Sequence, residues 1–298
     1  MQNSSINFKS GYVALIGMPN VGKSTLLNQI LEYKLSIVSN KPQTTRTKIL
    51  GILTKKDFQI VFIDTPGLLE PSYSLQTLFM KHVKTAIKDS DVIIYIHDVT
   101  KGDLTEDEIA KYFSYIKKPI VFVINKIDLI SKKLLLPLIS KYHGLANFSS
   151  IIPISALKRD GLENLVNEIR NLLPYSPPFF PPDELSSQQE RFFVSEIIRE
   201  KIYHFFGDEI PYSTHVQIET FKEKSTGKNF ISAVIYVEKN SHKGIIIGKG
   251  GQALKRIGQI SRKEIEKLLG KQIYLELNVK ILKNWRRNSS ELKRLGYS

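Results

Sequence analysis

A glycine-rich segment at residues 17–24 reads GMPNVGKS and matches the phosphate-loop pattern G-x-x-x-x-G-K-[ST]. Gly17 and Gly22 carry no Cβ, so the backbone can wrap closely around phosphate oxygens. Lys23 is spaced to reach the β- and γ-phosphates, and the Ser24 hydroxyl to ligate magnesium. The alternative is a glycine turn opening an ordinary helix. An apolar run before the segment and a helical pattern after it favour the phosphate loop.

A second motif, DTPG, occupies residues 64–67 and follows the apolar run QIVFI. At a strand end, the Asp64 carboxylate can hold a magnesium ion through a water molecule, and the Gly67 N–H can donate to a γ-phosphate. In isolation these four residues make an ordinary turn. Downstream of a phosphate loop, they indicate a segment that contacts the terminal phosphate.

A third motif, NKID, occupies residues 125–128 and follows the apolar run PIVFVI. The Asp128 carboxylate can accept two hydrogen bonds from guanine, which adenine cannot supply, so the wrong base leaves it unpaired. Asn125 is expected to tie this loop to the phosphate loop, and the Lys126 stem to cover one face of the base. The Ala156 N–H, in the short sequence ISA, can bond guanine O6, although ISA alone carries almost no information.

Another glycine-rich segment, residues 245–258, reads IIIGKGGQALKRIG. Its GKGG core is a GXXG loop, the element with which KH domains clamp about four nucleotides of single-stranded nucleic acid. Lys249, Lys255 and Arg256 add positive charge, and residues 245–247 would form an apolar wall for the bases. The residues expected to contact RNA are Ile245, Ile247, Gly248, Lys249, Gly250, Gly251, Lys255 and Arg256.

This region could instead be a structural domain that binds no RNA, because glycine turns are common and a basic face can simply be solvated. The only tryptophan, Trp285, precedes two arginines and could stack on a base. It is better explained as the anchor of the last helix to a core.

Composition narrows the class of protein. The 298 residues suffice for one large or two ordinary domains. The absence of cysteine excludes a disulfide framework and thiolate metal sites. The polar N-terminus lacks a secretory signal, and no apolar run is long enough to span a membrane. The net charge is +14, of which residues 239–298 hold +11, suggesting an anionic partner for that segment.

The positions of the motifs depend on strands and helices, and the apolar runs predict where the strands lie. Continuous apolar strands alternating with helices predict an α/β fold with a mostly parallel, doubly wound sheet, and every motif falls at a strand end, where such sheets bind ligands. The expected strands cover residues 12–17, 59–63, 91–98, 119–124 and 150–155. The expected helices cover residues 23–33, 75–89 and 104–116.

A proline-rich stretch separates this part from a second one. Its sequence LPYSPPFFPP cannot continue a helix or a central strand, so it predicts a stiff linker. We expect a nucleotide-binding domain over residues 1–174, a linker over 175–185, and a smaller α+β domain over 186–298. The second domain should contain helices at 186–206 and 252–269, strands at 214–224, 229–238 and 272–280, and a final helix at 282–295.

The ordered motifs over residues 10–173 resemble those of TRAFAC-type GTPases, which implies a six-stranded Ras-like domain. The α-β-β-α-α-β order of the second part resembles a type II KH domain. A GTPase domain with QTTR, DTPG and NKID, followed by one KH domain and the ending LKRLGY, is similar to the bacterial Era family over almost the whole chain.

The resemblance assigns further roles around the nucleotide. The QTTR motif within residues 41–51 points to Thr45 as a magnesium ligand that senses the γ-phosphate, with Thr44 close behind. Leu68 stands where many Ras-like enzymes place a water-orienting glutamine, which implies slow intrinsic hydrolysis. Asn20 matches the asparagine that such enzymes use as a potassium ligand, which implies stimulation by potassium. Hydrolysis would depend on Lys23, Thr45, Asp64 and Gly67.

The resemblance also implies a function and partners. The protein would bind GTP and GDP with Mg²⁺, bind the single-stranded 3′ end of 16S rRNA, and act in assembly of the small (30S) ribosomal subunit and in rRNA maturation. It would be cytoplasmic and monomeric, with peripheral association at the inner face of the cell membrane. The expected nucleotide contacts are Gly17, Met18, Pro19, Asn20, Val21, Gly22, Lys23, Ser24, Thr25, Asp64, Thr65, Pro66, Gly67, Leu68, Asn125, Lys126, Asp128, Ser155 and Ala156.

Two other functions compete with this one. The chain could be an RNA-binding module whose nucleotide site is only structural. It could also be a GTPase whose second domain binds protein or membrane, although the sequence shows no marked amphipathic anchor. Hydrolysis assays and RNA-binding assays distinguish these three.

Overall fold

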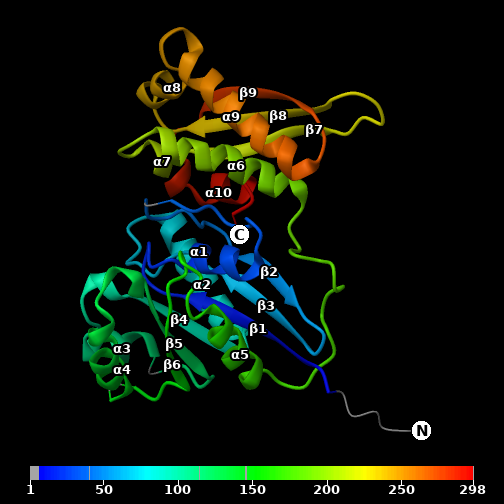
Figure 1. Ribbon diagram of the computed structural model, residues 1–298. Coiled ribbons are helices and arrows are strands. Elements are labelled where there is room, and N and C mark those ends of the chain that lie inside the picture. The colour runs from blue at the N-terminus through cyan, green and yellow to red at the C-terminus, as the bar shows by residue number, and fades with distance from the viewer. Residues whose placement is uncertain (1–6, 40, 114, 145, 298) are drawn as a thin grey trace. The chain divides into compact units, whose positions relative to one another are not determined.

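The computed structural model describes residues 7–39, 41–113, 115–144 and 146–297 (Figure 1). These residues form two compact units. The first takes in the chain up to Ser36, Thr45–Glu70 and Phe79–Ser187. The second takes in Ile37–Thr44, Pro71–Leu78 and the chain from Gln188 onward. Two short segments near the nucleotide motifs therefore group with the C-terminal part of the chain.

The first unit is built on a six-stranded sheet in the order β2-β3-β1-β4-β5-β6. Neighbouring strands run parallel except β2 and β3, which are antiparallel. This confirms the predicted Ras-like, mostly parallel sheet. The strands are β1 (Lys9–Ile16), β2 (Ile49–Thr54), β3 (Phe58–Asp64), β4 (Val92–Asp98), β5 (Ile120–Asn125) and β6 (Ser150–Pro153).

Helices connect these strands. The α-helices are α1 (Lys23–Leu31), α2 (Ser74–Asp89), α3 (Glu106–Phe113), α4 (Leu135–His143) and α5 (Leu162–Leu172). Short 3-10 turns are η1 (Val99–Lys101), η2 (Ile127–Leu129) and η3 (Lys132–Leu134). Helix α1 ends earlier than the expected Tyr33, because Glu32 adopts a left-handed conformation with φ 53°.

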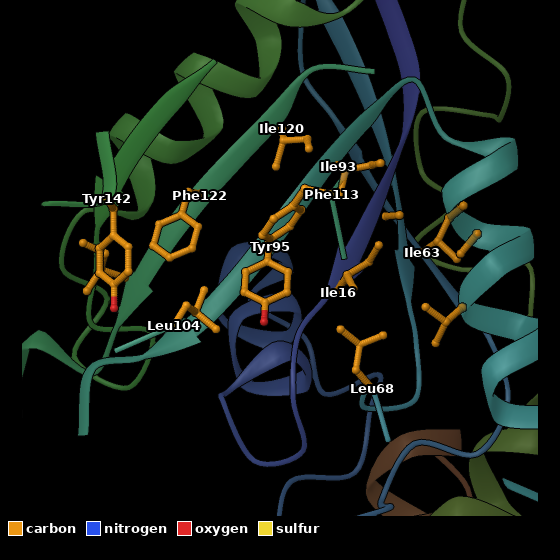
Figure 2. Close-up of a cluster of buried hydrophobic side chains, with 14 residues drawn as sticks. Ile16, Ile63, Leu68, Ile93, Tyr95, Leu104, Phe113, Ile120, Phe122 and Tyr142 are labelled. Atoms are coloured by element: carbon orange, nitrogen blue, oxygen red, sulfur yellow. The ribbon is translucent and has the colours of Figure 1, made fainter. Parts of the chain in front are cut away.

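The core of the first unit explains why its strands read as apolar runs. Every residue of β3, β4 and β5 is buried. Tyr95 and Phe122 stack in the interior with ring centroids 5.8 Å apart, Phe113 packs edge-on against Tyr95, and Tyr142 lies tilted by 38° against Phe122 (Figure 2). Each such side chain contributes about 1.5–3 kcal/mol through burial. This packing holds the strands in place, and the motifs follow directly at the strand ends.

The linker region, residues 175–185, lies within the first unit and contains a turn in which the Glu184 N–H donates to the Pro181 carbonyl at 3.2 Å. The Gln59 side chain accepts from the N–H groups of Phe179 and Phe180, at 2.7 and 3.0 Å, and donates to the Phe180 carbonyl at 2.8 Å. The Ile52 N–H, on β2, donates to the Leu185 carbonyl at 2.9 Å. Backbone groups of this stretch are thus hydrogen-bonded to strands β2 and β3.

The second unit contains a three-stranded sheet in the order β7-β8-β9, with β7 antiparallel and β9 parallel to β8. Its strands are β7 (His215–Lys222), β8 (Asn229–Val237) and β9 (Ile273–Ile281). Its helices are α6 (Glu190–Phe205), α7 (Ile210–Ser213), α8 (Asn240–Ile247), α9 (Gln252–Leu269) and α10 (Ser289–Arg294), with 3-10 turns η4 (Lys249–Gly251) and η5 (Trp285–Arg287). The longer elements follow the predicted α-β-β-α-α-β order.

The expected helix at residues 282–295 is wrong as a single element. The structure has η5 and α10 instead, separated by Asn288 in an extended conformation with φ −101°. The Asn288 side chain accepts from the N–H groups of Ser290 and Glu291, at 2.9 and 3.2 Å. It therefore caps a new helix rather than continuing the old one.

Candidate nucleotide-binding and nucleic-acid-binding sites

The phosphate loop connects β1 to α1, and its two glycines are required by their surroundings. Gly22 has φ 101°, and a Cβ there would lie 2.3 Å from the Asn125 side-chain nitrogen. Gly17 has φ 153°, and a Cβ there would lie 2.3 Å from the Ile96 carbonyl oxygen. Any other residue at either position would have to push the loop away from its neighbours.

Lys23 lies inside this loop with 6% of its surface exposed. Its amine donates to the carbonyl oxygens of Gly17 at 2.9 Å and Met18 at 2.8 Å. Burial lowers the pKa of Lys23 to about 8, and the Asp64 charge opposes that shift. An anionic phosphate bound in the loop would favour the charged amine. The side chain is thus held where a phosphate would need it.

The three residues predicted to serve magnesium meet at the end of β3. The Ser24 hydroxyl donates to the Asp64 carboxylate at 2.9 Å, and the Thr45 hydroxyl lies 3.0 Å from Ser24 Oγ and 3.3 Å from the same carboxylate oxygen. The other Asp64 oxygen is buried and accepts no hydrogen bond from the described residues. Burial raises the pKa of Asp64. Hydroxyl and carboxylate oxygens are the ligands that Mg²⁺ prefers, so the residues fit this ion.

The DTPG segment lies directly against the phosphate loop. The Leu68 N–H donates to the Gly17 carbonyl at 3.0 Å, and the Thr65 hydroxyl donates to the Leu15 carbonyl at 2.7 Å. A Cβ on Gly67 would lie 2.8 Å from Pro19. The Leu68 side chain points into the core (Figure 2), so it offers no polar group to a water molecule.

The NKID segment is joined to the same loop. The Asn125 side chain donates to the Val21 carbonyl at 2.7 Å and accepts from the Ala156 N–H at 3.0 Å. The exposed Asp128 carboxylate accepts from the Ser155 hydroxyl at 2.6 Å. Hydrogen bonds thus join segments far apart in the sequence beside the predicted base-reading carboxylate.

Asp98 contacts the NKID segment, although none of the sequence motifs contains it. It is fully buried at the end of β4 and accepts from the Lys126 amine at 2.5 Å. The same amine donates to the Asn20 carbonyl at 3.0 Å. Burial opposes ionisation of Asp98, but bonds to Lys126 and Thr100 hold its pKa below the usual value. Its position at a strand end, beside that of Asn125, was the available signal.

Other residues predicted to contact the nucleotide lie in or directly after the phosphate loop. Asn20 has a left-handed backbone with φ 64°, Met18 is 38% exposed, and Val21 is buried. Thr25 lies in the first turn of α1. Among the residues described, no cluster of three His, Asp or Glu side chains offers a different kind of metal site.

In the second unit, the GKGG loop joins α8 to α9 and has an open backbone. Gly250 and Gly251 have φ 58° and 77°, and a Cβ on either would meet nothing within 4 Å. A Cβ on Gly248 would lie 2.7 Å from Ala253. Gly248 is therefore needed for packing, whereas Gly250 and Gly251 leave the backbone accessible to a ligand.

The side chains around that loop differ in availability. Lys249, Lys255 and Arg256 are all exposed, and the Arg256 guanidinium also lies over the Phe205 ring at 4.7 Å. The expectation of an apolar wall at residues 245–247 is wrong for Ile246, which is fully buried in the core. Ile245 is 49% exposed, and Ile247 is half-buried. One helical turn cannot present three consecutive side chains on one face.

Trp285 is an anchor, as the alternative interpretation expected. It is fully buried, its indole N–H donates to the Ser213 carbonyl at 3.0 Å, and its ring stacks on Tyr297 with centroids 5.9 Å apart. It is not available to stack on a base.

Within the second unit, the segment preceding Thr45 is bonded to α6. The Tyr203 hydroxyl donates to the Gln43 carbonyl at 2.9 Å, and the Arg199 guanidinium donates to the Thr44 carbonyl at 2.5 Å. The Lys41 amine donates to the Tyr203 carbonyl. Because the Thr45 hydroxyl lies beside both Ser24 and Asp64, the geometry favours Thr45 as the metal ligand.

Comparison with known families agrees with the two units. Residues 12–126 match the family described as 50S ribosome-binding GTPase, and residues 209–286 match the KH domain. No helix within the described part of the chain is both long and apolar enough to cross a membrane.

Curated relatives match over nearly the whole chain. GTPase Era of Geotalea daltonii is 47% identical, covering 97% of this chain and 98% of that protein. GTPase Era of Ruminiclostridium cellulolyticum is 45% identical, covering 98% of each.

Two solved structures are also similar, each with a TM-score of 0.93 and 41% identity over 98% of this chain. One is Era in complex with MgGDPNP and nucleotides 1506–1542 of 16S ribosomal RNA, of which 99% is covered. The other is a tyrosine-to-alanine variant of Aquifex aeolicus Era bound to GDP and AlF4−, of which 100% is covered. This chain belongs to the GTPase Era family.

Proposed function

We propose that this GTPase binds GTP with Mg²⁺ in its first unit and single-stranded 16S rRNA in its second, and acts in assembly of the 30S ribosomal subunit and maturation of its rRNA. The observation that carries the proposal is the meeting of Ser24, Thr45 and Asp64 beside a glycine loop that is itself bonded to the NKID segment. The Era complex with MgGDPNP and 16S rRNA supports both ligands.

In the proposed mechanism, the phosphate loop holds the β-phosphate with its N–H groups, and the Lys23 amine leaves its carbonyl partners for phosphate oxygens. Ser24 and Thr45 would hold the magnesium ion directly, and Asp64 through water. The ion, when bound, neutralises charge that develops on the phosphates. The Gly67 N–H would donate to the γ-phosphate. These residues position and stabilise the reacting group, which is what phosphoryl transfer chiefly requires.

Base selection would rest on Asp128. Its exposed carboxylate is oriented by the Ser155 hydroxyl, and the Ala156 N–H, bonded here to Asn125, lies on the neighbouring segment. Guanine offers two N–H donors to a carboxylate, while adenine leaves the carboxylate unpaired. This makes GTP and GDP, rather than adenine nucleotides, the proposed ligands.

RNA would bind at the open GKGG loop. The exposed backbone of Gly250 and Gly251 admits a sugar-phosphate chain, Lys249 and Lys255 supply charge, and Ile245 supplies an apolar contact. The concentration of positive charge in residues 239–298 supports a polyanionic partner.

The nucleotide state would gate RNA binding. Thr45 would follow the γ-phosphate and magnesium, while the preceding residues Gln43 and Thr44 are bonded to α6 of the second unit. Loss of the γ-phosphate would release Thr45 and change the strain on those bonds, which couples the two functions. We further propose, on the basis of this ribosome-assembly role, that the protein acts in the cytoplasm.

The experiment measures RNA binding by filter retention of a short oligonucleotide with the rRNA 3′-end sequence, and GTP hydrolysis in single turnover. Gly250→Asp should abolish RNA retention while leaving hydrolysis unchanged, because a carboxylate would repel phosphates at an otherwise open position. The matched control is Gly270→Asp, which also has positive φ and open space but lies at the far end of α9.

Three outcomes are informative. Retained RNA affinity in Gly250→Asp would contradict the assignment of the GKGG loop. Absence of any single-turnover hydrolysis in the wild type would favour an RNA-binding module with a structural nucleotide site. Absence of RNA retention by the wild type would favour a GTPase whose second unit binds another partner.

A further inference from the structure

The sheet of the second unit has two unlike faces. One face is apolar and packs against helices α6, α8 and α9. The strand register defines the other face in rows of three residues, one from each of β7, β8 and β9. Across β7, β8 and β9 these rows are Lys222–Phe230–Tyr274, Thr220–Ser232–Glu276, Gln217–Val234–Asn278 and His215–Tyr236–Lys280.

The C-terminal residues cover one end of this face. His215 is bonded to the Tyr297 hydroxyl at 2.9 Å and packs against the Trp285 ring with centroids 5.7 Å apart. The Arg294 guanidinium lies over the Tyr236 ring at 5.7 Å. The opposite row receives no such cover in the described structure, because Tyr274 is 60% exposed there.

At that opposite row, two aromatic rings form a small platform. Phe230 and Tyr274 stack with ring centroids 5.8 Å apart and planes inclined by 11°. Phe230 is half-buried and lies against the Tyr274 ring. A single exposed tyrosine is ordinary on a protein surface, so the platform alone indicates no ligand.

The charges around the platform are the second observation. Lys222, Lys224, Lys228 and Lys271 are all exposed in the β7–β8 hairpin and just before β9. The Asn229 N–H donates to the Gln272 carbonyl at 3.0 Å, so these two segments lie side by side. Among the described residues, none of the four lysines forms an ion pair, and Glu223 is the single acid within residues 222–228. The hairpin side of the platform is therefore complementary to a polyanion, while the exposed Glu276 stands in the adjoining row on the other side.

We propose that the Phe230–Tyr274 platform stacks one unpaired nucleobase of RNA, and that the hairpin lysines bind the phosphates on either side of it. Stacking on an aromatic ring tolerates any base, and nearby lysines add affinity that falls with salt. This site is separate from the GKGG loop, since α8 and α9 pack on the other face of the sheet. It deepens the proposed RNA-binding function, on which the identity of the polymer rests, by lengthening the stretch of RNA that the protein contacts.

The test compares the full-length protein and its variants on two unstructured RNA oligonucleotides, one of five nucleotides and one of about twenty, by fluorescence anisotropy. Tyr274→Ala should weaken binding of the long RNA by roughly 5- to 100-fold, the range expected for losing one stacked base, and leave the short RNA unaffected. Tyr274→Phe should restore binding. Lys222→Ala should reduce the salt dependence for the long RNA alone.

The matched control is Tyr115→Ala in the first unit, which removes a tyrosine of similar exposure. If the wild type binds both RNAs and Tyr274→Ala binds the long one equally well, the platform does not stack a base, and a protein partner becomes the better occupant. If the wild type binds neither RNA, the proposed RNA-binding function itself fails. If Tyr274→Ala weakens the short RNA to the same degree, the effect is on folding of the unit, and the proposal is overturned.

Discussion

The Asn125 side chain donates to the Val21 carbonyl at 2.7 Å, so the base-reading segment is fastened to the phosphate loop. This single bond crosses from β5 to the turn between β1 and α1. It sets the distance between the site for the guanine and the site for the phosphates before any nucleotide arrives. Such preorganisation reduces the ordering required on binding.

Asp128→Asn should exchange guanine for xanthine preference, because an amide can no longer accept both N–H donors of guanine. Loss of two hydrogen bonds to a charged group is worth about 3–6 kcal/mol, or roughly 140- to 20,000-fold in affinity for GTP. Competition between GTP and XTP for a fluorescent nucleotide measures this. Unchanged affinity for GTP would remove Asp128 from the base site.

Gly22→Ala should abolish nucleotide binding and destabilise the first unit. Its Cβ would stand 2.3 Å from the Asn125 amide at a backbone φ of 101°, so the bond from Asn125 to the loop would break. Gly102→Ala is the matched control, since Gly102 also has positive φ but its Cβ would meet nothing within 4 Å. Nucleotide titration and thermal unfolding compare the two, and equal losses would show that backbone strain alone is responsible.

Potassium should stimulate hydrolysis, and Asn20→Ser should remove that stimulation while leaving the rate in sodium unchanged. Asn20 holds its left-handed conformation beside Lys126, at the edge of the loop where the phosphates would lie. Initial rates in matched potassium and sodium buffers provide the measurement. Equal turnover of the wild type in both salts would contradict the potassium prediction.

Acid should destabilise the first unit through His97. Burial lowers the pKa of His97 below its ordinary value of 6.5, so the unfolded chain takes up a proton that the folded one refuses. The associated stability is present above pH 6.5 and is lost as the pH falls below it. His97→Gln should reduce the drop in melting temperature between pH 7.5 and 5.5. The same change at exposed His143 should leave the drop intact.

Tyr203→Phe should loosen the link between the nucleotide and RNA sites. It removes the bond to the Gln43 carbonyl and leaves the buried ring in place. We expect the ratio of RNA affinities measured with a GTP analogue and with GDP to move towards one, while each unit keeps its melting temperature. A ratio identical to that of the wild type would show that this bond carries no coupling.

The buried strands were predictable from sequence because they are continuous apolar runs. Strand β2 was not, since its sequence ILGILT has a glycine and follows a polar loop. Gly51 is placed there because a Cβ would lie 2.7 Å from the Leu31 side chain, a tertiary contact that local sequence does not record. The resemblance to six-stranded relatives supplied the missing strand.

The candidate nucleotide site was predictable where chemistry dictates residue type and spacing, as at Lys23 and Asp64. Asp98 was missed because its role is to bond another side chain, Lys126, and no spacing rule links the two. Ile246 was misplaced because apolar residues in a row do not reveal which one points inward. The break at Asn288 was missed because a cap within a helical pattern is decided by local competition for N–H groups.

The stretch that connects the two units also closes an open flank of the first sheet. β2 is an outermost strand, and the chain at Leu185 and Ser186 takes up hydrogen-bonding groups at Ile52 and Leu50 that would otherwise face outward. Unguarded groups of this kind invite pairing with a second molecule. Proteolysis here, or truncation before residue 185, would therefore do more than separate the two units. It would expose the edge strand β2 and favour self-association of the isolated nucleotide-binding unit.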